Sequence, residues 1–194
     1  MRPPAALAGR LDVSRETGEK LAAYVALLEK WQTRVNLVSA STLPDIWSRH
    51  IWDSAQLAPL VPANTRRILD VGSGAGFPGL VLAALCDAEC HLVESDQKKA
   101  IFLQTVVRAC GIPATIHTAR IESLPSLGAD IVTARALAPM DKLLDLLAHQ
   151  LTPASRCLFL KGAQAKSELA ALGTRPELSW ELTPSLTNPA AFVV

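Results

Sequence analysis

The segment that most restricts the fold is LDVGSGAGFPG, at residues 69–79. A short apolar run at 67–71 leads into it, with Asp70 two residues before the first of three glycines in the spacing G-x-G-x-G. An apolar stretch at 77–86 follows, with the composition of a helix. A strand that enters a glycine turn and continues into a helix is typical of α/β folds that bind a ligand at the carboxyl ends of parallel strands.

The same alternation continues along the chain. Asp96 is suited to cap a helix that runs to Gly111, where a glycine stops helices. Further strands are expected at 91–94, 114–118, 130–134 and 157–161, with helices between them. Five strands alternating with helices predict an α/β, Rossmann-like fold with a mostly parallel twisted sheet and helices on both faces.

The N-terminal region has a helical pattern instead. Ser14 is a candidate N-cap, and a second helix is expected after Thr42, with Pro44 in its first turn and Asp45 completing a capping pair. The apolar stripe of the first helix consists of Leu21, Tyr24, Val25, Leu28 and Trp31. Prolines break the pattern near residues 58–65. We therefore predict a small N-terminal helical cap at 1–60 and a ligand-binding domain at 61–194.

Composition narrows the class of protein. Hydrophobic residues make up 49% and charged residues 19% of the 194 residues, which excludes a disordered chain. The longest apolar run, at 79–86, is too short to cross a bilayer, so a cytoplasmic protein is expected. A net charge of +1 neither requires nor excludes a nucleic-acid partner. The four cysteines contain no C-x-x-C pair, which favours buried free thiols and no metal site.

Two cofactor classes compete for the glycine turn. A dinucleotide needs G-x-G-x-x-G, but Phe77 occupies the third position of that pattern, and the carboxylate of Asp70 would repel a pyrophosphate. S-adenosylmethionine has no phosphate and carries a sulfonium and an ammonium, so nearby acids suit it. Gly72, Gly74 and Gly76 would then allow close approach of the backbone to this cofactor.

Two later segments add candidate contacts. Glu94 ends the second strand, 24 residues after Asp70, where a carboxylate can accept hydrogen bonds from both ribose hydroxyls. The alternative is a solvated acid near the start of the next helix. Ile121 and Glu122 follow the third strand, near the expected adenine, although Glu122 would also suit a surface helix cap.

The loop after the fourth strand, TARALAP at 133–139, should face the methyl group and its acceptor. It lacks the N/D-P-P-Y/F segment of exocyclic-amine methyltransferases and a Pro-Cys nucleophile. No cluster of carboxylates and histidines suggests a metal for oxygen methylation. An acceptor that needs no base fits this loop best, and guanine N7 carries a free lone pair, so positioning alone can suffice.

Taken together, these segments resemble a known family. They comprise LEKWQTRVNLVS (28–39), RHIWDS (49–54), the glycine segment (69–79), LVESDQKKAIFL (92–103), ARALAP (134–139) and LKG (160–162). The chain resembles the glucose-inhibited division protein B family of bacterial methyltransferases. The resemblance implies a class I methyltransferase that uses S-adenosylmethionine to modify guanine N7 in 16S ribosomal RNA of the small ribosomal subunit, and a monomer is expected.

The resemblance also assigns residues to the cofactor. It places the family's cofactor contacts at Gly72, Phe77, Ile121–Glu122 and Arg135, and its ribose acid at Glu94. Arg135 would lie between cofactor and RNA as the catalytic residue, where a guanidinium can hold a phosphate or stack on a base. The alternative for Arg135 is a structural ion pair at the end of a strand.

A basic rim around the cofactor would contact the RNA substrate. The candidates for this rim are Arg49, His50, Lys98, Lys99 and Lys161. A solvated helix face explains the two adjacent lysines equally well. The histidine could instead pack in a helix and bond to Asp53. The tryptophans at 31, 47 and 52 are expected in the core of the cap.

Two departures from the family pattern stand out. Gln32 replaces the usual Asn after Trp31, and the chain after Lys161 is proline-rich where a fuller final hairpin with basic residues is expected. Two other functions compete with an rRNA methyltransferase. One is a methyltransferase for a small molecule or protein, and the other is a non-catalytic RNA-binding module on the same fold. The intact Asp70, glycine turn and Glu94 weigh against the second.

Overall fold

The computed structural model describes residues 13–173, 175 and 178–194, and these form a seven-stranded sheet of order β3-β2-β1-β4-β5-β7-β6. The parallel strands are β1 (Arg67–Val71), β2 (Glu89–Glu94), β3 (Ala114–Thr118), β4 (Ile131–Arg135) and β5 (Arg156–Lys161), and the antiparallel ones are β6 (Thr183–Pro184) and β7 (Phe192–Val193). The chain runs outward from β1 to β3 and then returns to place β4 on the other side of β1. Strand order therefore reverses between β1 and β4, where ligands bind in such sheets.

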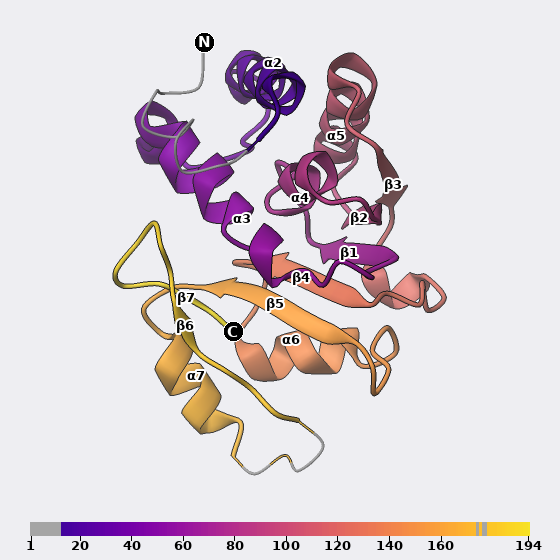
Figure 1. Ribbon diagram of the computed structural model, residues 1–194, viewed down its shortest axis with the longest axis vertical. Helices are drawn as coiled ribbons and strands as arrows, with labels where there is room; N and C mark the ends of the chain where they lie inside the picture. The colour runs from indigo at the N-terminus through magenta and orange to yellow at the C-terminus, as the bar shows by residue number, and fades with distance from the viewer. Residues whose placement is uncertain (1–12, 174, 176–177) are drawn as a thin grey trace.

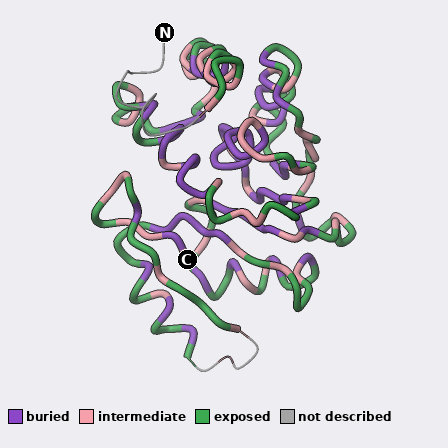
Figure 2. The backbone as a smooth tube through the Cα atoms, in the orientation of Figure 1, coloured by how far each residue is buried: buried purple, intermediate pink, exposed green. Residues whose placement is uncertain are grey.

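Helices cover both faces of the sheet, as predicted (Figure 1). Helices α2 (Arg15–Gln32), α4 (Gly79–Leu85) and α5 (Gln97–Cys110) lie on one face, and α6 (Met140–Leu147) and α7 (Ala165–Ala171) lie on the other. Two hydrophobic clusters correspond to these layers, and the central strands between them are buried (Figure 2). The N-terminal helices share the first cluster with the strands and α4, so burial of apolar surface holds the cap on the sheet.

A helical segment follows Thr42, as predicted, but it is irregular. The chain forms a 3-10 helix at Ala40–Asp45, a π-helix at Trp47–Trp52, α3 at Asp53–Ala55 and a further 3-10 helix at Ala58–Leu60. Pro44 lies inside the first of these and lacks the N–H that an α-helical ladder needs. The expected capping pair of Thr42 and Asp45 does not form among the described residues, because the Thr42 hydroxyl instead donates to the Ser39 carbonyl and accepts from Nε2 of His50. The N-cap at Ser14 is confirmed, because its side chain accepts from the Thr17 N–H.

Other elements also differ from the predictions, and β2 and β5 begin earlier than predicted, at Glu89 and Arg156. The helix predicted from residue 77 begins at Gly79, because the glycine turn extends further than the apolar run suggests. Between β3 and β4 the described residues contain a short 3-10 helix at Ile121–Ser123 in place of an α-helix. Strand β4 begins at Ile131 and not at the predicted residue 130. The carboxylate of Asp130 accepts from the N–H groups of Arg66 and Arg67 at the start of β1.

The ends of α5 are as predicted. The Asp96 side chain accepts from the N–H groups of Lys98 and Lys99, and Gly111 ends the helix with a φ of +61°. In the C-terminal region, the proline-rich segment after Lys161 supplies the short pair β6 and β7, which pairs with the edge of β5. Among the described residues, no helix combines the length and apolar character needed to cross a membrane.

Candidate active site at the glycine turn

The glycine turn lies at the carboxyl end of β1 and is held by backbone hydrogen bonds. The N–H groups of Gly72 and Ser73 both donate to the carbonyl of Val93 in β2, at 3.0 and 3.1 Å. Within the turn, the Gly76 N–H donates to the Ser73 carbonyl at 2.7 Å. Gly72, Gly74 and Gly76 all have positive φ values, of +67°, +57° and +97°. Other L-residues rarely adopt these values, so the spacing of the glycines follows from the path of the backbone.

The three glycines differ in what surrounds them. A Cβ built on Gly72 would lie 2.6 Å from Cδ1 of Leu137, and one on Gly76 would lie 2.5 Å from Cδ1 of Leu80. A Cβ on Gly74 would meet just the Gly72 carbonyl oxygen, at 3.8 Å, among the described residues. The turn is therefore packed at its two ends and open in the middle, at Gly74.

Glu94 reaches this open part of the turn. Its Oε2 accepts from the Gly74 N–H at 2.8 Å, and its Oε1 accepts from the Asp96 N–H at 2.7 Å. The structure thus joins the end of β2 to the glycine turn, as the predicted site requires. Capping of α5 falls to Asp96 and leaves Glu94 beside the turn.

Asp70 lies beneath the turn and is 1% exposed. Its Oδ1 accepts from the Thr133 hydroxyl on β4 at 2.8 Å, while Oδ2 has no hydrogen-bond partner among the described residues. Burial raises the pKa of this carboxyl group to about 6. The carboxylate of Asp70 is therefore buried on the side of the turn that packs on the sheet. The carboxylate that reaches Gly74 is that of Glu94.

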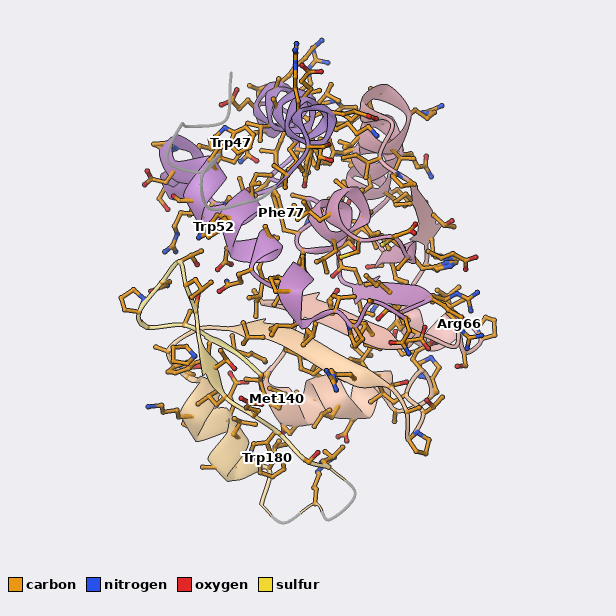
Figure 3. All side chains as sticks on the ribbon, in the orientation of Figure 1. Trp47, Trp52, Arg66, Phe77, Met140 and Trp180 are labelled. Carbon is orange, nitrogen blue, oxygen red and sulfur yellow. The ribbon has the colours of Figure 1, made fainter. Side chains whose placement is uncertain are left out.

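Phe77 is buried between the cap and α4 (Figure 3). Its ring stacks on His50, with centroids 5.0 Å apart, and lies 5.3 Å from the ring of Tyr24. The Tyr24 hydroxyl donates to the carbonyl of Ala75, so α2 holds the glycine turn directly. Tyr24 belongs to the apolar stripe of the first predicted helix, and no pattern in the sequence pointed to this bond.

Arg135 ends β4 and connects the sheet with the cap. Its guanidinium carbon lies 4.9 Å from the centroid of the Phe77 ring. Its Nη1 donates to Nδ1 of His50 at 3.0 Å and to the carbonyl of Arg49 at 3.4 Å, and lies 3.8 Å from Oδ2 of Asp53. The ion pair considered as the alternative for Arg135 is therefore present, beside the ring of Phe77.

His50 is 8% exposed and points inward. Because Nδ1 accepts from Arg135, the proton lies on Nε2, which is 2.8 Å from the Thr42 hydroxyl oxygen. Thr42 in turn donates to the Ser39 carbonyl at 2.7 Å. Burial and the neighbouring Arg135 lower the pKa of His50 to about 3, so the ring is neutral at physiological pH. The bond to Asp53 that sequence analysis considered is replaced by these contacts.

The remaining basic candidates lie in different environments. Lys161 is 8% exposed, and its Nζ donates to the Ala138 carbonyl at 2.5 Å and to Oε2 of Glu168 at 2.8 Å. Arg49 and Lys98 are exposed, and Lys99 is half-buried. The structure therefore leaves Arg49, Lys98 and Lys99 accessible, whereas Lys161 and His50 hold the site from inside.

The segment after β3 lies close to Glu94. The Ala119 N–H donates to the Glu94 carbonyl at 3.2 Å and joins this segment to the end of β2. Ile121 is buried, with its carbonyl 3.0 Å from Nε2 of His149, and Glu122 is exposed. The structure thus brings Ile121 and Glu122 to the same edge of the sheet as the turn.

Metal ligands do not cluster in the part of the chain that the structure describes: it holds no group of three or more His, Cys, Asp or Glu side chains suited to a metal ion. The four cysteines are free thiols. Burial raises the pKa of Cys90 to about 12 and that of Cys157 to about 11, so neither is a ready nucleophile.

The chain matches the GidB family, described as rRNA small subunit methyltransferase G, over residues 17–187. It is 50% identical over 191 residues to the ribosomal RNA small subunit methyltransferase G of Paramagnetospirillum magneticum, covering 98% of this chain and 93% of that protein. The identity to the protein of the same name from Rhodospirillum centenum is 53% over 186 residues, covering 94% of this chain and 84% of the other.

Two solved structures have a similar fold. The cofactor-bound Rv0187 from MTB superposes with a TM-score of 0.65 at 18% identity, covering 100% of this chain and 96% of that one. A SAM dependent methyltransferase from Aquifex aeolicus gives a TM-score of 0.58 at 14% identity, covering 77% of this chain and 90% of the other. At these identities the likeness concerns the fold alone.

Proposed function

The chain belongs to the GidB family, rRNA small subunit methyltransferase G, and on that premise we propose that it methylates N7 of a guanine in 16S ribosomal RNA. It is an S-adenosylmethionine-dependent rRNA methyltransferase of the class I α/β fold. The single observation that carries the assignment of the cofactor site is the 2.8 Å bond from the Gly74 N–H to the carboxylate of Glu94. This bond places the carboxylate of Glu94, the candidate acceptor for the ribose hydroxyls, beside the accessible backbone of Gly74.

The residues present fit this cofactor. Gly74 has open space where a Cβ would stand, so a ligand can approach the backbone closely. The nearest acids, Glu94 and the buried Asp70, would repel a pyrophosphate but favour a ligand that carries a sulfonium and an ammonium. Both carboxylate oxygens of Glu94 keep a second lone pair for the ribose hydroxyls.

We assign the other contacts around this centre. Ile121 and Glu122 lie at the same edge and are placed to border the adenine. Phe77 and Arg135 lie on the opposite side of the turn, toward the cap. Asp70 contributes its charge from beneath, and Gly72 and Gly76 fix the path of the turn.

S-adenosylmethionine, when bound, supplies a methyl group on sulfur that the N7 lone pair attacks as the carbon–sulfur bond breaks and its electron pair stays on sulfur. N7 carries no proton, so the protein needs to supply no base for this step. This agrees with the neutral, internally bonded His50 and the high pKa values of the buried thiols. What remains for the protein is to hold the two reacting atoms in line.

The exposed Arg49 and Lys98, with the half-buried Lys99, are the candidates for phosphate contacts. We propose that Lys161 and His50, which sequence analysis grouped with them, support the site from within. We further propose that the predicted cap at 1–60, of which residues 1–12 lie outside the described residues, covers the cofactor-binding domain 61–194 through residues 13–60. We also propose that a monomer of the chain acts on the small subunit without a metal.

Methyl transfer from labelled S-adenosylmethionine to small ribosomal subunits lacking the modification tests the proposal. Borohydride and aniline cleave RNA at 7-methylguanine, so a single strong cleavage in the 16S RNA is expected. Naked 16S RNA serves as the second substrate and separates an RNA from an assembled subunit as the target. Labelled RNA that resists this cleavage would reject N7 as the accepting atom.

Glu94→Gln tests the cofactor site separately. Loss of a charge-assisted bond is expected to weaken S-adenosylhomocysteine binding by about thirtyfold, or about 2 kcal/mol, in a calorimetric titration. Glu89→Gln is the matched control, because Glu89 starts the same strand and is exposed. Equal affinities of the two variants would remove Glu94 from the site.

A further inference from the structure

The loop at residues 136–139, directly after β4, contains a strained residue. Ala136 has a φ of +51° and is the one described residue other than glycine with a positive φ. This conformation costs an L-residue about 1–2 kcal/mol, so the surrounding structure must hold it in place.

An ion pair between the buried Lys161 and the half-buried Glu168 holds the loop at its far end. Lys161 on β5 donates to the carbonyl of Ala138, and its partner Glu168 on α7 accepts from the backbone N–H of Met140 at 2.9 Å. At the near end, Arg135 is fixed by its contacts with the cap. Four residues between two fixed ends leave the loop little freedom.

This path places the side chain of Leu137 against the glycine turn. Its Cδ1 would lie 2.6 Å from a Cβ on Gly72, yet the residue is 38% exposed. Strands β1 and β4 are neighbours, so Leu137 stands at the crevice where the order of strands reverses. Leu137 thus packs against Gly72 on one side and leaves the rest of a large apolar side chain exposed at this crevice, which is the surface that a ligand would cover.

We propose that Leu137 contacts the target base, packing against the face of the guanine ring so that N7 points toward the methyl group. The inference rests on the proposed function. A side chain without polar atoms suits a planar ring, and N7 needs positioning rather than proton transfer. Phosphate contacts elsewhere supply most of the affinity for RNA, so the effect of Leu137 falls on the methyl-transfer step.

Leu137→Ala tests this in the full-length protein with small ribosomal subunits. We expect kcat to fall at least about tenfold through lost positioning. The KM for subunits and the affinity for S-adenosylhomocysteine should stay within about threefold, because phosphate contacts dominate binding of RNA. Leu137→Met, which keeps the apolar volume, should restore most of the kcat. Leu60→Ala is the matched control, since Leu60 is 37% exposed and lies in the 3-10 helix before β1.

Two results would overturn the inference. An unchanged kcat in Leu137→Ala would show that the base does not use this side chain. A fall in cofactor affinity that matches the fall in kcat would make Leu137 a cofactor contact. Both leave the proposed function intact, whereas a wild-type protein that labels RNA without producing 7-methylguanine would reject the proposed function itself. Melting temperatures of all three variants separate lost positioning from lost folding.

Discussion

The turn after β1 and the loop after β4 lie side by side at the same edge of the sheet, but they are held in different ways. Backbone bonds to the adjacent β2 and a single carboxylate, Glu94, hold the turn. Side chains from distant parts of the chain hold the loop and Arg135, the residue that precedes it: His50, Asp53, Lys161 and Glu168. One is a local structure, and the other depends on the finished tertiary fold.

This difference predicts different responses to substitution. A turn held by backbone groups should tolerate changes except where a glycine is required. A loop held by the buried Lys161 and the half-buried Glu168 should fail when either charge loses its partner, because the remaining ion is then largely shielded from water without compensation. Substitutions in the two regions can therefore test the contrast directly.

Lys161→Met should have the largest effect on stability. It leaves Glu168 without its cation and the carbonyl of Ala138 without its donor, which should lower the free energy of unfolding by about 4 kcal/mol. Urea denaturation measures this, with the exposed Lys142→Met as control. The double variant Lys161→Met/Glu168→Leu should recover part of the loss. A loss below about 1 kcal/mol would instead mark Lys161 as free to contact RNA.

Asp70→Asn should change how stability depends on pH. Asp70 connects the two regions through Thr133, and burial raises the pKa of its carboxyl group from 3.8 to about 6. Below pH 3.8 the group is protonated in both states and has no effect. As the pH rises from 3.8 to about 6, the unfolded state ionises while the buried carboxyl group stays protonated, so the wild type should lose about 3 kcal/mol of stability over this range and no more above it. The Asn variant should lack this decrease, as measured by urea denaturation between pH 4 and 7.

Asp130→Asn is a control of opposite sign. Hydrogen bonds from the N–H groups of Arg66 and Arg67 lower the pKa of Asp130, so the stability that Asp130 contributes is present above the unfolded pKa and lost as the pH falls.

For the Asp70 prediction, parallel pH curves for the wild type and Asp70→Asn would mean that water or a counter-ion reaches the buried carboxyl group of Asp70.

The same contrast explains what the sequence could predict. The strand, the three glycines and Glu94 were predicted because their physical reasons act over short distances: positive φ values, an alternating pattern and a fixed spacing between strand ends. The α5 caps at Asp96 and Gly111 are equally local. The parallel sheet followed from the alternation of strands and helices.

The contacts around Arg135 could not be predicted in this way. The bond from Arg135 to His50 spans 85 positions, and that from Thr187 to Asp53 spans 134. Nothing in the local sequence distinguishes a lysine in a buried pair from one on a basic rim, which is why Lys161 was grouped with exposed residues. The helix after Thr42 was predicted, but its irregular form was not, because the π-helix at Trp47–Trp52 has the same apolar spacing as an α-helix over so few residues.

The smallest expected changes in the free energy of unfolding come from alanine substitutions at Gly76 and Gly74, which should differ from each other. Gly76→Ala should lower the free energy of unfolding by about 2 kcal/mol, since φ is +97° and the new methyl group would crowd Leu80 and the Tyr24 hydroxyl. Gly74→Ala faces open space and should cost about 1 kcal/mol for its φ alone.

Binding should reverse that order, because the added methyl group of Gly74→Ala would stand where the cofactor approaches the backbone. Calorimetric titration with S-adenosylhomocysteine should then show the larger loss of affinity in Gly74→Ala, even though urea denaturation shows it to be the more stable variant. Gly76→Ala retains the open surface and should bind once folded. Losses of affinity and stability that rank in the same order would mean that the turn acts as one rigid unit. Opposite rankings would show that, in the glycine turn, the residues that pack its ends are not the residues that bind the cofactor at its centre. The loop after β4 does not allow such a division, because the same charged side chains hold it in place throughout.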